Sequence, residues 1–249
     1  MVISIASQKG GTGKTTTSLT LASGLGLAGK RVLLVDLDSQ ANSSKVAHPD
    51  YQSVKSEDTL FATILHRKPL SRVPSRFANV DVVPSHILLA ETDLHLTTAK
   101  DHREARLKKQ LDVMKDEYDY VLIDCPPSLG WLTLNAFTAS DSVLVVVSPG
   151  YFELDSLVQI GKVLEEVREL FNPSLGFLGF LFTMSDPTVN SKTSLKILRQ
   201  TYTDQVLKSV VPRNTDMRDA HMNKQSIFDY APQSSSAHAY KKLLEELQL

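Results

Sequence analysis

Residue types that bind phosphate are concentrated in one short stretch near the start of the chain. Residues 7–17 read SQKGGTGKTTT and lie between the apolar run 2–6 and a helical pattern, which predicts a strand-to-helix turn. Glycines let backbone N–H groups point at an anion, and a helix N-terminus adds partial positive charge. The stretch therefore predicts a nucleotide-phosphate loop made of Lys9, Gly10, Gly11, Thr12, Gly13, Lys14, Thr15 and Thr16.

This loop differs from the usual eight-residue pattern at its first position. The pattern has glycine where this chain has Gln8, and the shifted Lys9-Gly10-Gly11 brings a second lysine to the mouth of the loop. Lys14 adds a full positive charge for the phosphates. The hydroxyl of Thr15 is placed to hold a magnesium ion.

Acidic residues follow two apolar runs further along the chain. Asp124 ends the run 120–123 and fits a carboxylate that holds the magnesium ion through water. Asp36 and Asp38 lie two residues apart after the run 32–35. One of them is expected to orient the attacking water and the other to support the metal shell. Cys125 has no organised histidine partner and precedes a proline, so we expect a buried structural thiol.

The elements that position these residues alternate between strands and helices. Apolar runs predict strands at 2–6, 32–35, 80–83, 120–124, 143–147, 178–182 and 206–211. Helical patterns cover about 13–28, 59–65, 87–98, 103–115, 157–171, 191–202 and 236–247. Strands that are apolar throughout are typical of parallel sheets covered on both faces. The predicted fold is α/β, a doubly wound, mostly parallel sheet with helices on both faces and ligands at the carboxyl ends of its strands.

Composition sets limits on the class of protein. The 249 residues, 42% of them hydrophobic, suit one domain spanning 1–249. With 27 basic and 28 acidic residues, any attraction to nucleic acid must come from a local patch. The single cysteine excludes a disulfide framework. No run of about eighteen apolar residues occurs, so we expect a cytosolic protein.

Three segments together resemble the deviant-Walker ATPases of the ParA/MinD group. They are Lys9–Thr16, Val35–Gln40 and Ile123–Pro127, and the resemblance covers nearly the whole chain. The segments 211–213, 227–232 and 236–240 resemble the ParA/Soj branch, which partitions plasmids and chromosomes. The family usually has proline at the position of Ser39 and tyrosine at that of Ser185, departures that do not affect the phosphate chemistry.

The resemblance implies an ATPase with ATP and Mg²⁺ as cofactors. In such proteins the lysine at the position of Lys14 contacts the phosphates of its own ATP. The lysine at the position of Lys9 contacts the nucleotide of the other subunit across a sandwich homodimer. The aspartate at the position of Asp38 is needed for hydrolysis. The implied catalytic residues are Lys9, Lys14 and Asp38, and the implied metal residues are Thr15, Asp38 and Asp124. Adenine is expected near Met184, Pro212, Arg213 and Asn214.

The resemblance also implies a cycle on DNA. An ATP-bound homodimer would hold nonspecific DNA until a ParB-like protein or cargo adaptor stimulates hydrolysis, in the cytoplasm and on the nucleoid. The cargo stays open between a plasmid, a chromosome and a protein body. Basic residues in the C-terminal third predict the DNA contacts: Lys192, Lys196, Arg199, Arg213, Arg218 and Lys224.

Two other classes of protein are considered from the sequence. A MinD-like membrane ATPase would need a basic amphipathic helix at its C-terminus, but residues 241–247 are short and balanced in charge. A metabolic enzyme of the same superfamily would need a substrate pocket or cluster cysteines. The chain begins at its first predicted strand, so we expect no preceding DNA-reading domain and no autorepression at a specific operator.

Overall fold

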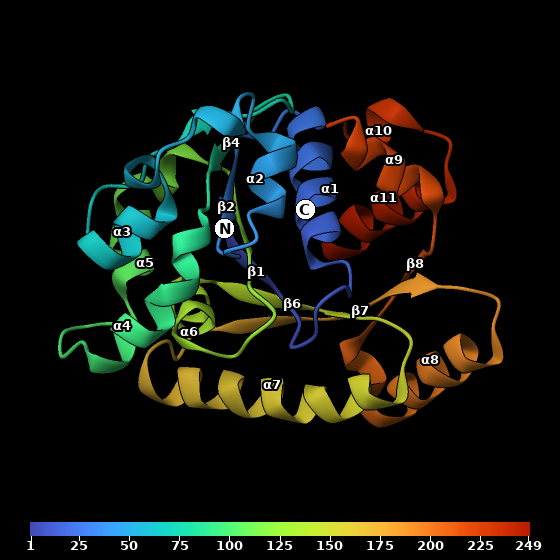
Figure 1. Ribbon diagram of the computed structural model, residues 1–249. Coiled ribbons are helices and arrows are strands. Elements are labelled where there is room, and N and C mark those ends of the chain that lie inside the picture. Colours follow the sequence, from blue (N-terminus) through green and yellow to red (C-terminus); the bar gives the residue numbers. More distant parts are fainter.

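The apolar runs of the sequence form one eight-stranded sheet in the computed structural model (Figure 1). The structure describes the backbone of residues 1–249 and the side chains of residues 1–114, 116–150 and 157–249. The strands are β1 (Val2–Ala6), β2 (Val32–Asp36), β3 (Val73–Pro74), β4 (Val80–Val83), β5 (Tyr120–Asp124), β6 (Ser142–Val147), β7 (Gly176–Ser185) and β8 (Val206–Pro212). Their order across the sheet is β3-β4-β2-β5-β1-β6-β7-β8.

The sheet is parallel except at one edge, where β3 pairs with β4 in the antiparallel sense. Its first strand, β1, lies between β5 and β6, with Ile3 opposite Leu122 on one side and Ser142 on the other. Because parallel strands have their carboxyl ends on the same side of the sheet, the loops after β1, β2, β5, β7 and β8 gather on that side. The predicted fold class, a doubly wound and mostly parallel sheet, is confirmed.

Helices connect the strands. The α-helices are α1 (Lys14–Leu27), α2 (Asn42–Ala47), α3 (Leu60–His66), α4 (Thr92–Thr98), α5 (Arg106–Met114), α6 (Trp131–Ala139), α7 (Tyr151–Leu170), α8 (Val189–Tyr202), α9 (Thr215–Met222), α10 (Ile227–Tyr230) and α11 (Ser235–Leu247). Short 3-10 turns cover Tyr51–Ser53, Ser56–Asp58, Ile87–Glu91, Lys115–Glu117 and Thr203–Gln205.

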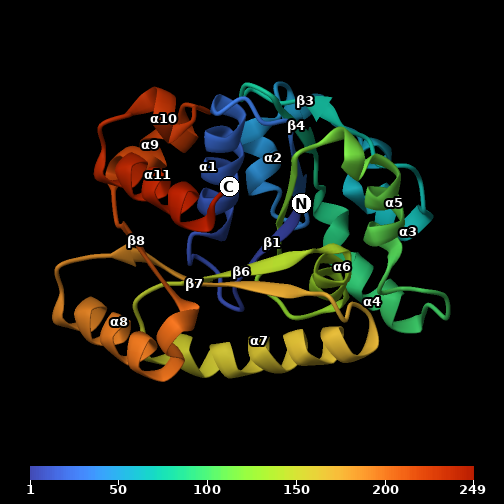
Figure 2. The ribbon, with the colours of Figure 1, turned by 180° about the vertical axis from the view of Figure 1, so that it is seen from behind.

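Each face of the sheet has its own hydrophobic core. On one face α1, α9, α10 and α11 pack on the strands through side chains such as Leu21 and Tyr240, both nearly inaccessible to solvent. On the other face α3 to α8 pack through residues such as Phe137 and Ile160. The two ribbon views show α1 and α11 on the side of the sheet opposite α7 and α8 (Figures 1 and 2).

The helices differ from the sequence prediction in several places. The predicted helix 87–98 is a 3-10 turn followed by α4, and the helix expected over 103–115 begins at Arg106. Its Leu107 and Leu111 are buried. The helices α2, α6, α9 and α10 were not predicted from the sequence. Most of α6 is buried, so its sequence lacks the one-sided apolar pattern by which a surface helix is recognised.

Candidate nucleotide-binding site

The loop after β1 has the backbone that its glycines predict. Gly11 has φ of 77° and Gly13 has φ of 91°, a left-handed conformation that side chains disfavour. A Cβ atom at Gly10 or Gly11 would meet no protein atom within 4 Å, so these two residues border open space. Gly13 then caps the N-terminus of α1, whose partial positive charge suits an anion.

Hydrogen bonds hold the loop in place from two sides. The hydroxyl of Thr183, in β7, donates to the carbonyl oxygen of Thr12 over 2.6 Å. Within the loop, Lys14 Nζ donates to the carbonyl oxygen of Lys9 over 3.1 Å, and Thr12 Oγ1 donates to the same oxygen over 3.4 Å. Lys14 is only 6% exposed, whereas Lys9 lies at the exposed mouth of the loop.

Asp124 lies beside the first turn of α1. Its two carboxylate oxygens accept hydrogen bonds from Ser18 Oγ, over 3.1 Å, and from Ser43 Oγ, over 2.6 Å. The side chain of Thr15 lies near this carboxyl group and acts to lower its pKa. Burial raises the pKa of Asp124 above its ordinary value, because a desolvated carboxylate is costly. The structure thus brings together Thr15 and Asp124, two of the three predicted metal residues.

Asp36 and Asp38 have different surroundings. Asp36 is fully buried, accepts hydrogen bonds from the backbone and hydroxyl of Ser44, and is the register partner of Asp124 across β2 and β5. Burial, followed by the charge of Asp124, raises the pKa of Asp36 to about 8. Asp38 instead borders the cavity in front of the loop, where Oδ1 accepts from the backbone N–H of Gln40 over 2.9 Å. Of this pair only Asp38 borders the cavity, and the roles of the two carboxylates in water orientation and metal support stay predictions.

The phosphate loop borders a cavity of about 310 Å³. Its walls come from the loop, from the segment after β2 and from the segment after β5. The predicted residues Thr12 and Lys9 are not among its lining residues, which are Gly10, Gly11, Gly13, Lys14, Thr15, Thr16, Asp38, Gln40, Asn42, Pro127 and Met184. The positions of Gln40, Asn42 and Pro127 in the cavity wall were not predicted from the sequence, because each borders the cavity only through the folding of its loop.

A second cavity, of about 760 Å³, adjoins the first and shares Gly13, Thr16 and Met184 with it. Met184 has φ of 52°, a left-handed conformation that is rare for a side chain of this size, at the point where β7 ends. Four residues predicted to surround adenine line this cavity together: Met184, Pro212, Arg213 and Asn214. Their contact with a base stays a prediction.

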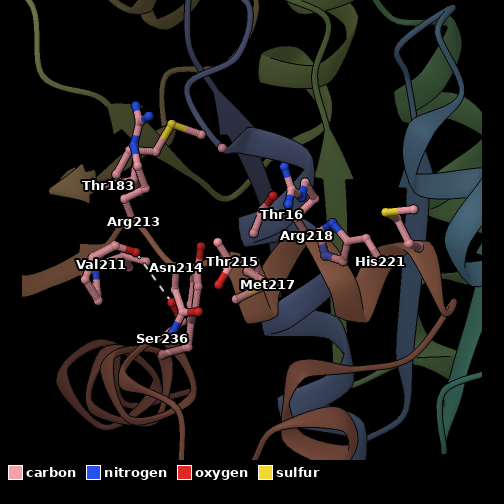
Figure 3. Close-up of a pocket in the computed structure, with 15 residues that line it drawn as sticks. Thr16, Thr183, Val211, Arg213, Asn214, Thr215, Met217, Arg218, His221 and Ser236 are labelled. Carbon is pink, nitrogen blue, oxygen red and sulfur yellow. Dashed lines mark hydrogen bonds between the residues drawn. The ribbon is translucent and has the colours of Figure 1, made fainter. Parts of the chain in front are cut away.

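The far wall of this second cavity was missed by the sequence analysis. It comes from α9 and α11, and includes Met217, His221, Ser236 and Tyr240. Figure 3 shows Arg218 and His221 on the α9 side of the cavity and Arg213 on the side of β8. Burial lowers the pKa of His221, because an imidazolium loses hydration there.

The residues fit a magnesium-bound nucleoside triphosphate. Lys14, glycine backbone and a helix N-terminus meet at one cavity, and an apolar cavity with a few polar groups adjoins it. Among the described residues no group of three or more His, Cys, Asp or Glu side chains is arranged to hold a metal ion. A cage of that kind is unnecessary for Mg²⁺, which takes one or two protein oxygens and completes its shell with phosphates and water.

The basic residues predicted to contact DNA do not lie on one face of the sheet. Lys192, Lys196 and Arg199 belong to α8, whereas Arg218 belongs to α9 and Lys224 follows it. These two helices cover opposite faces (Figures 1 and 2). Arg213, at the carboxyl end of β8, borders the larger cavity together with Arg218. The patch seen in the sequence is therefore divided in space, and its DNA-binding role stays a prediction.

A glycine-rich loop between β1 and α1, with Lys14 and Asp124 beside it on a parallel sheet, defines a P-loop nucleoside triphosphatase. A family model described as AAA domain matches residues 1–177. The chain is 37% identical to the sporulation initiation inhibitor protein Soj of Bacillus subtilis, over 99% of this chain and 97% of Soj. It is 35% identical to the chromosome partitioning protein ParA of Myxococcus xanthus, over 99% of this chain and 87% of that protein.

Among solved structures, cobyrinic acid a,c-diamide synthase from Mycobacterium smegmatis with bound ADP and magnesium is 31% identical, with a TM-score of 0.82. The match covers 98% of this chain and 92% of the synthase. The chain belongs to the ParA/Soj branch of the ParA/MinD partitioning ATPases. It is accordingly an enzyme that hydrolyses ATP. In the part of the chain that the structure describes, no helix has the length and apolar character needed to span a bilayer.

Proposed function

We propose that this chain is a partitioning ATPase that works as an ATP-bound homodimer on nonspecific DNA. A ParB-like protein or another cargo adaptor stimulates hydrolysis and thereby releases the dimer from DNA. The cargo is a plasmid, a chromosome or a protein body, and the protein acts in the cytoplasm on the nucleoid. Support comes from relatives named as chromosome partitioning proteins, which match nearly the whole chain.

The observation that carries the proposal is the contrast between the two lysines of the loop. Lys14 is 6% exposed and lies at the cavity, so one subunit already has the lysine that a phosphate loop requires. Lys9 lies with Gly10 and Gly11 on the exposed rim. A lysine on this rim is placed to meet the phosphates of a second subunit, where charge accumulates as the terminal phosphoryl group leaves.

The other site residues divide the work within one subunit. Lys14 and the loop amides bind the phosphates, and Thr15 and Asp124 offer oxygen atoms on the metal side. When bound, Mg²⁺ supplies positive charge at the phosphate oxygens. Asp38, at the same cavity, orients the attacking water. The adjoining cavity holds the base between Met184 and the segment 212–214.

The test is the replacement Lys9→Ala. The variant should retain ATP binding through Lys14 and the backbone amides, dimerise poorly and hydrolyse ATP much more slowly. Size exclusion with light scattering, in a slowly hydrolysed ATP analogue, measures the dimer. Lys30→Ala, which removes another exposed lysine just after α1, is the matched control. A Lys9→Ala protein that dimerises and turns over ATP like wild type would leave an independent monomeric nucleotide switch as the better function.

A second candidate is a metabolic ATP-dependent enzyme. It is favoured by the 31% identity to a structure named as a diamide synthase. The two candidates differ in what stimulates ATP hydrolysis. Stimulation by DNA together with a partner protein supports partitioning, whereas turnover that requires a small carboxylic acid and an ammonia donor supports the synthase.

A further inference from the structure

Gln8 occupies the first position of the phosphate-loop pattern, where glycine is usual, and the proposed function gives it no role. Its side chain leaves the loop and reaches α7, where Nε2 donates to Gln159 Oε1 over 2.5 Å. In both ribbon views the loop between β1 and α1 extends toward α7 (Figures 1 and 2). A glycine at this position has no side chain with which to make the contact.

The α7 end of this contact is fixed to the sheet. Leu157 and Ile160, on either side of Gln159 in sequence, are 3% and 1% exposed and belong to the core beneath the sheet. Gln159 itself is exposed and points away from that core. The acceptor for Gln8 is therefore carried by a helix that cannot shift without disturbing packed side chains.

The loop end of the contact leads directly to Lys9. The N–H of Lys9 donates to Ser7 Oγ over 3.5 Å, and its carbonyl oxygen accepts from Lys14 Nζ and Thr12 Oγ1. The backbone of Lys9 thus carries its own side chain and also accepts the hydrogen bond from Lys14. A displacement of Gln8 moves the side chain of Lys9 and also the acceptor of Lys14.

The amide of Gln8 depends on this one contact. Its Oε1 atom is buried and has no hydrogen-bond partner among the atoms that the structure describes. Without Gln159, the described residues would leave the Nε2 end unpaired as well. The bond from Nε2 to Gln159 is solvent-exposed, and it is the side-chain contact that directs the Gln8 amide toward α7.

We propose that Gln8 is a positioning residue that, through Gln159, ties the Lys9 end of the phosphate loop to α7. The proposal rests on the proposed function for its catalytic consequence, since Lys9 is the residue being positioned. Gln159 then influences hydrolysis without touching ATP. A shift of α7 reaches Lys9 through a single side-chain hydrogen bond.

The experiment compares three single substitutions on α7. Gln159→Leu removes the acceptor at similar size. Gln159→Glu restores an oxygen acceptor for Gln8 Nε2 and should recover wild-type behaviour. Glu166→Leu is the control, because Glu166 is exposed on the same side of α7, two turns further along. Both positions are exposed, so folding should be unaffected, and circular dichroism verifies this.

Two readouts separate positioning from a general structural role. Gln159→Leu should lower kcat roughly tenfold through misplacement of Lys9, with KM changed less than about twofold because Lys14 still binds the phosphates. In the nucleotide-free monomer it should also speed backbone amide exchange over residues 8–12. Gln159→Glu and Glu166→Leu should match wild type in both.

The proposal fails if Gln159→Leu has wild-type amide exchange over residues 8–12, because the loop is then not held by α7. It fails equally if Gln159→Glu is as slow as Gln159→Leu, since the acceptor would be irrelevant. The measurements differ if the proposed function is wrong and the positioning role of Gln8 is right. In that case Lys9→Ala dimerises and hydrolyses ATP normally, while Gln159→Leu still loosens the loop.

Discussion

The ammonium group of Lys14 donates a hydrogen bond to the backbone carbonyl of Lys9, over 3.1 Å. The lysine that the phosphate loop uses for binding is thereby turned toward its own loop. A phosphate oxygen that replaces this carbonyl offers the ammonium a charged acceptor, and charge-assisted hydrogen bonds are stronger. Nucleotide binding should therefore exchange one contact of Lys14 for a better one while the backbone of Lys9 is released.

Lys14→Ala tests this exchange. Removing the ammonium takes away a charged donor to the phosphates, and the affinity for ATP should fall roughly 100-fold or more. Isothermal calorimetry with Mg-ATP measures the loss, and Lys30→Ala should bind like wild type. Equal ATP affinity in Lys14→Ala and wild type would contradict the predicted role of Lys14.

Asp38→Ala should impair hydrolysis and spare ATP binding, in contrast to Lys14→Ala. Asp38 borders the phosphate cavity but is not part of the loop, so the variant should bind ATP and lose turnover. Asp38→Asn keeps an oxygen acceptor for the backbone N–H of Gln40 and separates loop structure from catalysis. Phosphate release assays measure the result. Undiminished hydrolysis by Asp38→Ala would show that the Asp38 carboxylate is not needed for the reaction.

Thr183→Val should weaken the support of the loop. The substitution keeps the side-chain shape but leaves the carbonyl of Thr12 without its 2.6 Å donor. Burying an unpaired acceptor costs about 1–3 kcal/mol, so the free energy of unfolding should fall by that amount and ATP should bind more weakly. Urea denaturation gives the first value and calorimetry the second.

Thr138→Val is the matched control for Thr183→Val. Thr138 is also buried, but its hydroxyl has no hydrogen-bond partner among the described residues. Replacing this hydroxyl with a methyl group should leave stability unchanged or raise it. A loss of stability at position 138 as large as at position 183 would show that the bond from Thr183 to Thr12 contributes nothing specific.

DNA binding should distinguish the two halves of the predicted basic patch. Arg199 lies on α8 and Arg218 on α9, which cover opposite faces of the sheet. Charge reversal at a residue that contacts phosphates should weaken binding steeply and lower the logarithmic salt slope by roughly one. Arg199→Glu and Arg218→Glu, measured separately by fluorescence anisotropy with ATP, identify the face that binds. Unchanged affinity in both would move the site elsewhere.

Acid should destabilise the protein partly through His221. Its pKa is lowered by burial, so below about pH 6.5, the usual pKa of histidine, the unfolded state binds more protons than the folded one. The free energy of unfolding should therefore fall as the pH drops from 7.5 to 5.5. His221→Gln should reduce that fall, as measured by urea denaturation. An unaltered pH dependence would mean that His221 is not the responsible group, and His48, whose pKa burial also lowers, is the next to test.

The sheet was predictable from the sequence because its strands are apolar on both faces. Runs such as 32–35 and 120–124 are short, continuous and bounded by polar residues, a pattern that few other structures share. Helices without a one-sided apolar pattern were not predictable. Most of α6 is buried, and α10 has only four residues, too few for any period to emerge.

The candidate site was predictable where chemistry is local in sequence. The loop 9–16 and Asp124 have fixed spacing to their strands, so their meeting follows from the fold. The roles of Asp36 and Asp38 could not be separated, because burial of Asp36 depends on Ser44 and on the neighbouring strand β5. The wall formed by α9 was missed because it reaches the cavity only by long-range packing.

The hydroxyl of Tyr240, on α11, hydrogen-bonds with that of Thr17, on α1, over 2.9 Å in the interior of the molecule. Leu243 of α11 belongs to the same core as Leu21 of α1. The helix that begins at the phosphate loop is thus covered by a segment synthesised more than two hundred residues later. During translation the phosphate loop is synthesised long before α11, which completes the hydrophobic core around α1. We therefore expect the ability to bind nucleotide to be acquired only after translation has passed α11.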